Sequence, residues 1–334
     1  MLEDFTRFVL DDARLSEDLK VLRHDFAAAA RPFLAAAVLH RDTQADVGTA
    51  ITTPGEQSRQ SVAHVVRAAT KRLTEALRSL EEFGKIDHPS ASKAIEALRY
   101  RAYILEQQLE LRLARLDSPD LRGRRLCVLI TESACKHPWQ EVAMQVLQAG
   151  APMLQLREKS LESGEFLRRA AWLSHECRRH DAVLIVNDRP DVALLAGAHG
   201  VHVGQDDLPP LLVRQLIGPG MLLGVSTHNM EQAQAAQSAG ADYIGCGPIF
   251  KSPTKPREFL PGLSFASEIG AAAGRLAIPA YGIAGITPGN VQEVLRTGIT
   301  HVAITSAITG SEVPGSVTRE ILSALGSGSL PADD

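Results

Sequence analysis

Hydrophobic residues recur at two different periods along the chain. Up to about residue 120 they recur every three to four positions, which is typical of amphipathic helices. The pattern predicts a helical run from Glu3 to Leu22, with breaks or caps at Asp12 and Ser16. Further helices are expected from about Ser58 to Glu82 and from about Ser90 to Leu116, after a polar loop. The N-terminal part is therefore expected to be all helical.

From Leu126 onward, short runs rich in Val and Ile alternate with segments of helical period. Repeated strand–helix alternation predicts a parallel sheet, and eight such units close a (β/α)8 TIM barrel. We expect an α/β fold in which a smaller all-α domain over residues 1–120 precedes a barrel over residues 121–334. The expected strands are Leu126–Ile130, Met153–Leu156, Val183–Val186, Val201–Val203, Leu222–Val225, Tyr243–Cys246, Pro279–Ile283 and Val302–Ile304.

Composition narrows the class of protein. The 334 residues are 45% hydrophobic and 22% charged with a net charge of -4, as in ordinary globular proteins. The charge and the 4% aromatic content argue against nucleic-acid binding. No apolar stretch is long enough to span a membrane, and we see no signal peptide. Four scattered cysteines favour a reducing compartment, so we expect a cytoplasmic protein, with homo-oligomers left open.

Polar residues follow the second strand, and active sites of such barrels lie at the carboxyl ends of the strands. Gln155, Arg157 and Lys159 share one side of the chain there, because side chains alternate along a strand. Two cations and an amide suit a multiply charged anion such as a pyrophosphate. The alternative is a salt-bridged barrel rim in which Glu158 pairs with Arg157.

Carboxylates follow the next two strands. Asp188 and one of Asp206 or Asp207 are candidate ligands of Mg²⁺, which binds carboxylates together with substrate phosphate oxygens. The alternative for the acidic residues of these loops, which include Asp191, is helix capping. We interpret His202, in an apolar alternating strand, as a core residue or a support for the site.

The later loops add hydroxyls and glycines. Ser226 is a candidate hydrogen-bond donor, with a helix N-cap as the alternative, and His228 is expected at the surface or behind the site. The loop from Ser252 through Pro253 and Thr254 to Lys255 is interpreted as covering the substrate. After the last two strands, glycines and hydroxyls suit a phosphate, and the residues are Gly282, Ala284, Gly285, Thr305 and Ser306. Two phosphate-binding regions in one site indicate the joining of two phosphorylated substrates.

Six segments in order carry a resemblance to thiamine phosphate synthase from Leu126 to about Pro314. They are QLREK at 155–159, NDRPDVA at 187–193, GVHVGQDD at 200–207, GVSTH at 224–228, GADYIGCGPIF at 240–250 and SPTK at 252–255. The resemblance implies that 4-amino-2-methyl-5-hydroxymethylpyrimidine diphosphate loses pyrophosphate with Mg²⁺ as cofactor. A pyrimidine-stabilised carbocation is then attacked by the nitrogen of a thiazole phosphate, in plain or carboxylated form, and thiamine phosphate results.

The resemblance also assigns roles to residues. The implied catalytic residues are Arg157, Lys159, Ser226 and Lys255, and the implied Mg²⁺ ligands are Asp188 and Asp207. The implied substrate-binding residues, besides those four, are Gln155, Leu156, Glu158, Asn187, Ser252, Pro253, Thr254, Gly282, Ala284, Gly285, Thr305 and Ser306.

Two positions depart from the family pattern. The family usually has Thr at the position of Ser252 and Gly at the position of Ala284. Serine keeps the hydroxyl. At Ala284 we expect a backbone N–H to serve, with a negative φ angle that alanine adopts without strain.

The N-terminal region is similar to the helical domain often fused ahead of this synthase. The similar segments include EDFTRFVLDD at 3–12, DVGT at 46–49 and KRLTEALR at 71–78. Related domains are associated with hydroxymethylpyrimidine phosphate kinase activity, although no G-x-x-x-x-G-K-[ST] motif is present. A docking or dimerisation module is the alternative.

For the barrel, two further functions stay open at this point. One is a thiazole tautomerase of the same superfamily, which needs no metal pair. The other is a non-catalytic phosphate-binding barrel with a helical partner-binding domain.

Overall fold

A computed structural model describes residues 1–33, 59, 61–116, 118–251, 261–272 and 276–326. The chain divides into two compact units, Met1–Leu116 and Asp117–Asp334. The division lies four residues before the boundary expected from the sequence. None of the helices in these ranges combines the length and apolarity needed to cross a membrane.

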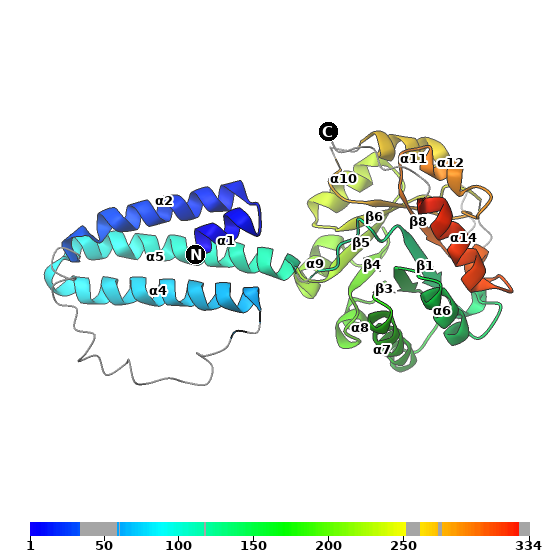
Figure 1. The fold of residues 1–334 in the computed structure, drawn as a ribbon, viewed down its shortest axis with the longest axis horizontal. Helices are drawn as coiled ribbons and strands as arrows, with labels where there is room; N and C mark the ends of the chain where they lie inside the picture. Colours follow the sequence, from blue (N-terminus) through cyan, green and yellow to red (C-terminus); the bar gives the residue numbers. More distant parts are fainter. Residues whose placement is uncertain (34–58, 60, 117, 252–260, 273–275, 327–334) are drawn as a thin grey trace. The chain divides into compact units, whose positions relative to one another are not determined.

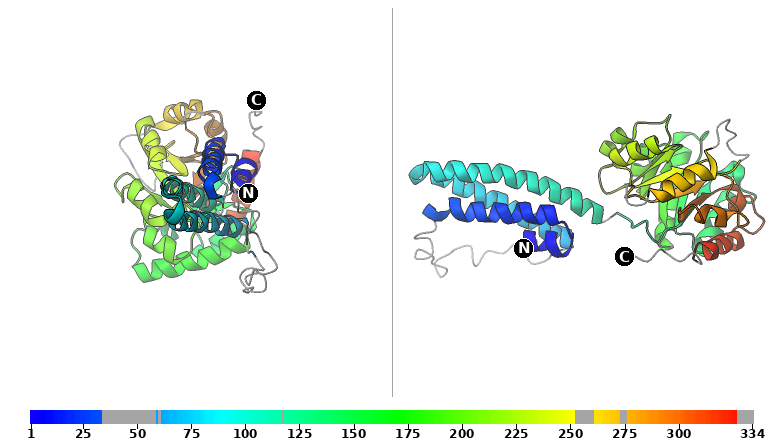
Figure 2. Two further views of the ribbon diagram at one scale, coloured as in Figure 1. Left: turned by 90° about the vertical axis from the view of Figure 1, so that its left-hand side faces the viewer. Right: turned by 90° about the horizontal axis from the view of Figure 1, so that it is seen from above.

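The first unit consists of α1 (Leu2–Phe8), α2 (Ala13–Ala29), α4 (Val62–Asp87) and α5 (Pro89–Leu116) among its described residues. Helix α5 lies beside both α2 and α4 (Figures 1 and 2). Asp12 caps α2 by accepting a hydrogen bond from the Leu15 N–H at 3.0 Å, which separates α1 from α2 where the sequence predicted a break. Ser16 lies inside α2.

A buried ion pair joins the two long helices of this unit. Glu81 of α4 accepts hydrogen bonds from Arg99 of α5 at 2.6 and 3.3 Å, and both side chains are largely buried. The Arg99 guanidinium lowers the pKa of the Glu81 carboxyl despite its burial. Removing one partner of such a pair costs about 3–5 kcal/mol, because a charge is left buried alone. The pair therefore fixes how α4 and α5 pack.

The second unit is a closed barrel of eight parallel strands in sequence order, surrounded by helices (Figure 1). This confirms the predicted (β/α)8 fold, and each strand agrees with its prediction to within two residues at either end. The strands are β1 (Leu126–Ile130), β2 (Met153–Leu156), β3 (Val183–Asn187), β4 (Gly200–Val203), β5 (Leu222–Thr227), β6 (Tyr243–Cys246), β7 (Ala280–Ile283) and β8 (His301–Ile304).

Helices follow the strands around the outside of the barrel, with a 3-10 turn, η2 (Glu132–Ala134), after β1. The helices described are α6 (Trp139–Gln148), α7 (Ser163–Arg179), α8 (Pro190–Leu195), α9 (Pro210–Ile217), α10 (Met230–Ser238), α11 (Gly262–Ala271), α12 (Val291–Leu295), α13 (Ser306–Thr309) and α14 (Pro314–Gly326).

Two apolar layers hold the barrel together. The larger lies between strands and helices and includes Leu154, Leu156 and Val186. The smaller fills the barrel interior with side chains such as Met153, Tyr243 and Tyr281. Adjacent residues of one strand thus enter different layers, because side chains alternate across a sheet.

Leu121, from the segment before β1, is buried with the inner layer, and its carbonyl accepts a hydrogen bond from the His301 ring at 3.1 Å. We therefore expect a chain that begins at Asp117 to fold as a barrel. A chain that begins at Arg122 should lose about 1.5–3 kcal/mol of stability with the Leu121 side chain. Urea unfolding followed by tryptophan fluorescence measures the difference, because both tryptophans, Trp139 and Trp172, lie in barrel helices. Equal stability of the two truncated chains would contradict the role of Leu121.

Candidate active site

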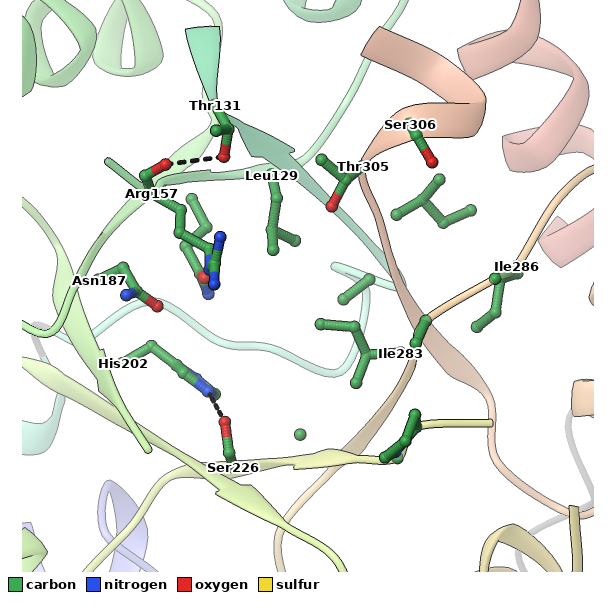
Figure 3. Close-up of a pocket in the computed structure, with 18 of the residues that line it drawn as sticks. Leu129, Thr131, Arg157, Asn187, His202, Ser226, Ile283, Ile286, Thr305 and Ser306 are labelled. Carbon is green, nitrogen blue, oxygen red and sulfur yellow. Dashed lines mark hydrogen bonds between the residues drawn. The ribbon is translucent and has the colours of Figure 1, made fainter. Parts of the chain in front are cut away.

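A cavity that is partly open to solvent lies at the carboxyl ends of the strands. Polar side chains from β2 to β5 line one part of it, and the loops after β6, β7 and β8 form a wall rich in backbone (Figure 3). Thr131, Thr305 and Ser306 add hydroxyl groups. In the figure, Arg157, Asn187, His202 and Ser226 lie along one side and Ile283, Ile286, Thr305 and Ser306 along the other. The structure thus brings together residues up to 150 positions apart that the sequence assigned to one site.

The Arg157 side chain is half-buried and lines the cavity. Its backbone is fixed on both sides, since its N–H donates to the Ile130 carbonyl at 2.9 Å and its carbonyl accepts from the Thr131 hydroxyl at 2.7 Å. The alternative, a rim salt bridge between Arg157 and Glu158, is not what the structure shows. Glu158 instead accepts a hydrogen bond from the Glu132 N–H at 2.7 Å and lies 3.5 Å from Arg169. The segments after β1 and β2 therefore fix the backbone from which the Arg157 side chain extends.

Two acidic side chains meet at the rim. Asp188 follows β3, and its N–H donates to the His202 carbonyl at 2.8 Å, while its φ angle is +62°. One carboxylate oxygen lies 3.4 Å from the Lys159 ammonium. Asp207 accepts a hydrogen bond from the Gly204 N–H at 2.7 Å. Burial and the neighbouring Asp207 raise the pKa of the Asp188 carboxyl, and Lys159 opposes them.

This donor set fits a hard divalent cation. Two neighbouring carboxylates repel one another, and a cation bound between their oxygen atoms offsets that repulsion. Among the described residues, no three His, Cys, Asp or Glu side chains are placed so that they could hold a metal ion together. Mg²⁺ suits such a sparse site, because it keeps several waters and takes its remaining ligands from substrate phosphates.

A hydrogen-bonded chain supports Ser226 from behind. The His202 Nε2 atom lies 2.9 Å from the Ser226 Oγ and its Nδ1 atom lies 3.2 Å from the Tyr243 hydroxyl. Burial lowers the pKa of His202 to about 4, so the ring is neutral at pH 7. The N-cap of α10 is Asn229, so Ser226 is not the cap that the sequence left open.

Gly224 leaves room for the two rings of this hydrogen-bonded chain. A Cβ atom on Gly224 would lie 2.1 Å from Tyr243 Cζ and 2.5 Å from His202 Nδ1, which no packing allows. Residue 224 therefore lacks a side chain so that the two rings can meet inside the barrel.

The loops after β7 and β8 face the polar wall. Ala284, Gly285, Thr305 and Ser306 line the cavity, and Thr305 is the N-cap of the short helix α13. The first N–H groups of a helix have no partner within it and are available to a ligand. A Cβ on Gly285 would lie 2.7 Å from the Lys251 carbonyl oxygen, so the close approach of two loops requires glycine here.

Ala284 has a φ angle of +81°, so the expected negative φ was wrong. The positive φ angle is associated with hydrogen bonds to a distant loop. The Ala284 carbonyl accepts a hydrogen bond from the Phe250 N–H at 3.1 Å, and the Ile283 carbonyl accepts one from Ile249 at 2.9 Å. These two bonds tie the loop after β7 to the loop after β6, and alanine at this position is strained.

Several assigned residues lie elsewhere. The Leu156 side chain packs in the layer beneath the helices, and a Cβ on Gly282 would point at Val294 of α12. Neither residue is among those that line the cavity, and nor is Glu158. Gln155 and Asn187 are buried and line it. The predicted substrate loop Ser252, Pro253, Thr254 and Lys255 lies outside the described residues.

Sequence reasoning missed other lining residues. His228 lines the cavity, with its Nδ1 atom 2.5 Å from the Gly247 carbonyl, although it was expected at the surface or behind the site. Thr131 directly follows β1, and the rule that sites lie at strand ends could have found it. Leu129 and Ile283 give the cavity apolar walls.

Comparison with known proteins agrees with this geometry. A family model described as thiamine monophosphate synthase matches residues 126–308, and one described as the ThiD2 family matches residues 1–108. The chain is 40% identical to the thiamine-phosphate synthase of Rhodopirellula baltica, over 92% of this chain and 83% of that one. It is 38% identical to the thiamine-phosphate synthase of Thermosynechococcus vestitus, over 98% and 91% of the two chains.

A solved structure agrees as well. The thiamine phosphate pyrophosphorylase of Pyrococcus furiosus is 31% identical with a TM-score of 0.57, over 62% of this chain and 98% of that one.

The strain at Ala284 gives a testable consequence. Ala284→Gly should raise the stability of the barrel by about 1 kcal/mol, because glycine adopts a positive φ without the cost that alanine meets. Ala280→Gly, in the preceding strand, is the matched control and should lower stability by about 0.5–1 kcal/mol. Urea unfolding followed by tryptophan fluorescence compares them. A stability loss in Ala284→Gly would contradict the strain.

Proposed function

The chain belongs to the thiamine phosphate synthase family, and we propose that its barrel joins two phosphorylated substrates across the cavity with the help of Mg²⁺. As a member of that family it is a transferase of thiamine biosynthesis that acts on small molecules. The observation that supports the proposal best is the division of the cavity wall. Arg157, Asn187 and Ser226 lie on one side, and the backbone-rich loops after β7 and β8 lie on the other.

We assign the diphosphate of the pyrimidine substrate to the side of β2 to β5. Arg157 and Lys159 are its cations, and the guanidinium can donate two parallel hydrogen bonds. Asp188 and Asp207 would hold Mg²⁺, which when bound shields the charge that grows on the departing pyrophosphate. Because that charge is larger in the transition state than in the substrate, these cations stabilise the transition state more.

The polar residues deeper in the cavity are assigned to the pyrimidine. Gln155 and Asn187 offer amide donors and acceptors, and Ser226 offers a hydroxyl oriented by neutral His202. An electron-rich pyrimidine stabilises the carbocation left when the carbon–oxygen bond breaks. Leu129 and Ile283 exclude water from that cation, which would otherwise be hydrolysed to the alcohol.

We assign the phosphate of the thiazole substrate to the opposite wall. Backbone N–H groups around Ala284, Gly285 and Ser306, with the Thr305 hydroxyl, suit a phosphate that takes no part in bond breaking. The thiazole nitrogen would then face the pyrimidine methylene carbon from across the cavity.

An assay tests the proposal directly. Purified protein mixed with pyrimidine diphosphate, thiazole phosphate and Mg²⁺ should release thiamine phosphate and pyrophosphate in equal amounts. A tautomerase would change only the thiazole partner, and a non-catalytic phosphate-binding barrel would leave both substrates intact. Either of these results would contradict the proposal.

The metal assignment makes a prediction of its own. Chelation should abolish coupling, added Mg²⁺ should restore it, and Asp188→Ala should stay inactive at any Mg²⁺ concentration. Without activity as the readout, Mg²⁺ should raise the melting temperature of the wild type and not of Asp188→Ala. A ligand at a hundred times its Kd adds about 2.7 kcal/mol to the stability of the state that binds it. Full turnover of the variant in chelator would remove Asp188 from the site.

Arg157→Lys should lower the single-turnover rate more than it weakens substrate binding. Lysine keeps the positive charge but cannot donate two parallel hydrogen bonds to one phosphate. Loss of one charge-assisted hydrogen bond costs roughly 1.5–3 kcal/mol, or about ten- to a hundred-fold in rate. Arg189→Lys is the matched control, because Arg189 is also at the rim but pairs with Asp191 at 2.6 Å. The control should leave the rate alone, and an unchanged rate in Arg157→Lys would exclude Arg157 from catalysis.

A further inference from the structure

Arg169 of α7 lies behind the rim of the cavity and does not line it. Its side chain is only 10% exposed, and its guanidinium contacts carboxylates from three segments of the chain. It lies 2.8 Å from Glu132, which follows β1, 3.5 Å from Glu158, which follows β2, and 2.9 Å from Glu165 of its own helix. The guanidinium also stacks over the Trp139 ring at 5.0 Å.

Glu158 is the critical member of this cluster. It stands between Arg157 and Lys159 in the sequence, and its side chain is 11% exposed. Burial raises the pKa of its carboxyl, while the hydrogen bond from Glu132 N–H and the cations Arg169 and Arg157 lower it. Arg157 is the adjacent residue in the chain, and the Glu158 carboxylate is turned toward the Glu132 N–H and Arg169.

We propose that Arg169 is a positioning residue of the synthase that attracts the Glu158 carboxylate in an ion pair at 3.5 Å and thereby keeps the Arg157 guanidinium available for the diphosphate. The inference rests on the proposed role of Arg157. Without Arg169, the charges of Glu158 and Glu132 would lose a buried counter-ion next to the anion site. Glu158 would then compete with the diphosphate for Arg157. The carboxylates of Glu158 and Glu132 would also repel the negatively charged diphosphate.

The effect should be confined to one substrate. The thiazole phosphate is assigned to the loops after β7 and β8, whereas Glu158 follows β2 next to Arg157. Loss of Arg169 should therefore raise the KM for the pyrimidine diphosphate and leave the KM for the thiazole phosphate unchanged. A general disturbance of the barrel would change both values.

The experiment measures binding of inorganic pyrophosphate, with Mg²⁺ present, to the full chain by calorimetry. Arg169→Gln should weaken binding roughly ten- to a hundred-fold, the range for a lost interaction with a charged group. Adding Glu158→Gln to that variant should restore most of the affinity, because the released charge is gone. Arg168→Gln is the matched control, since Arg168 is the next residue, is 76% exposed and pairs with Glu165, and it should bind as the wild type does.

Several results would overturn the proposal. If Arg169→Gln binds weakly because packing is disturbed, adding Glu158→Gln will not restore the affinity, and the role of Arg169 is structural only. Wild-type affinity in Arg169→Gln would contradict the proposal directly. If Arg169→Gln does not fold, Glu158→Gln alone decides, because it should bind pyrophosphate at least as tightly as the wild type. Weaker binding by that variant would make Glu158 a ligand and overturn the proposal.

Arg157→Lys separates this inference from the proposed function. If that variant binds pyrophosphate as the wild type does, the assignment of Arg157 to the diphosphate is wrong. If it binds more weakly and Arg169→Gln does not, the assignment stands and the role of Arg169 is wrong.

Discussion

The alternation of side chains along eight parallel strands is the constraint on which both the core and the site depend. In β2, Leu154 and Leu156 enter the layer beneath the helices, while Gln155 faces the interior and Arg157 continues on its side into the cavity. The register with β3 pairs Gln155 with Ile185, so the polar ends of the strands meet at one rim. A slip of one residue would place Arg157 beneath a helix, where an unpaired charge is strongly destabilising.

Several charged side chains lie at this rim, and only some of them form ion pairs with other side chains. Lys159 contacts Asp188, and Glu158 contacts Arg169, so two cations have carboxylate partners. The salt bridges formed between described residues include none to Arg157. Asp188 has a positive φ, and burial and the neighbouring Asp207 raise the pKa of its carboxyl. On the proposed assignment, a diphosphate that arrives with a divalent cation would supply the opposite charge to both groups at once.

The sequence predicted what depends on local pattern. The eight strands were recognisable because runs of Val and Ile are buried on both faces, and the rule that parallel barrels react at their strand ends located Arg157, Asp188 and Ser226. What failed depends on contacts between distant segments. Leu156 and Glu158 are contiguous with site residues in the sequence but face other layers. The φ of Ala284 follows from a bond to Phe250, which no local pattern of residues reveals.

The same dependence on distant contacts links the barrel interior to the chemistry. Tyr243 fills the inner layer, and its hydroxyl meets His202, whose other nitrogen meets Ser226 at the cavity. A buried, neutral imidazole has one donor and one acceptor nitrogen, so the orientation of one hydroxyl fixes that of the other. An ionised histidine would have two donors and could not order the chain in this way. The burial that stabilises the core therefore also sets the protonation state that the Ser226 hydroxyl needs, and packing and site geometry cannot vary independently here.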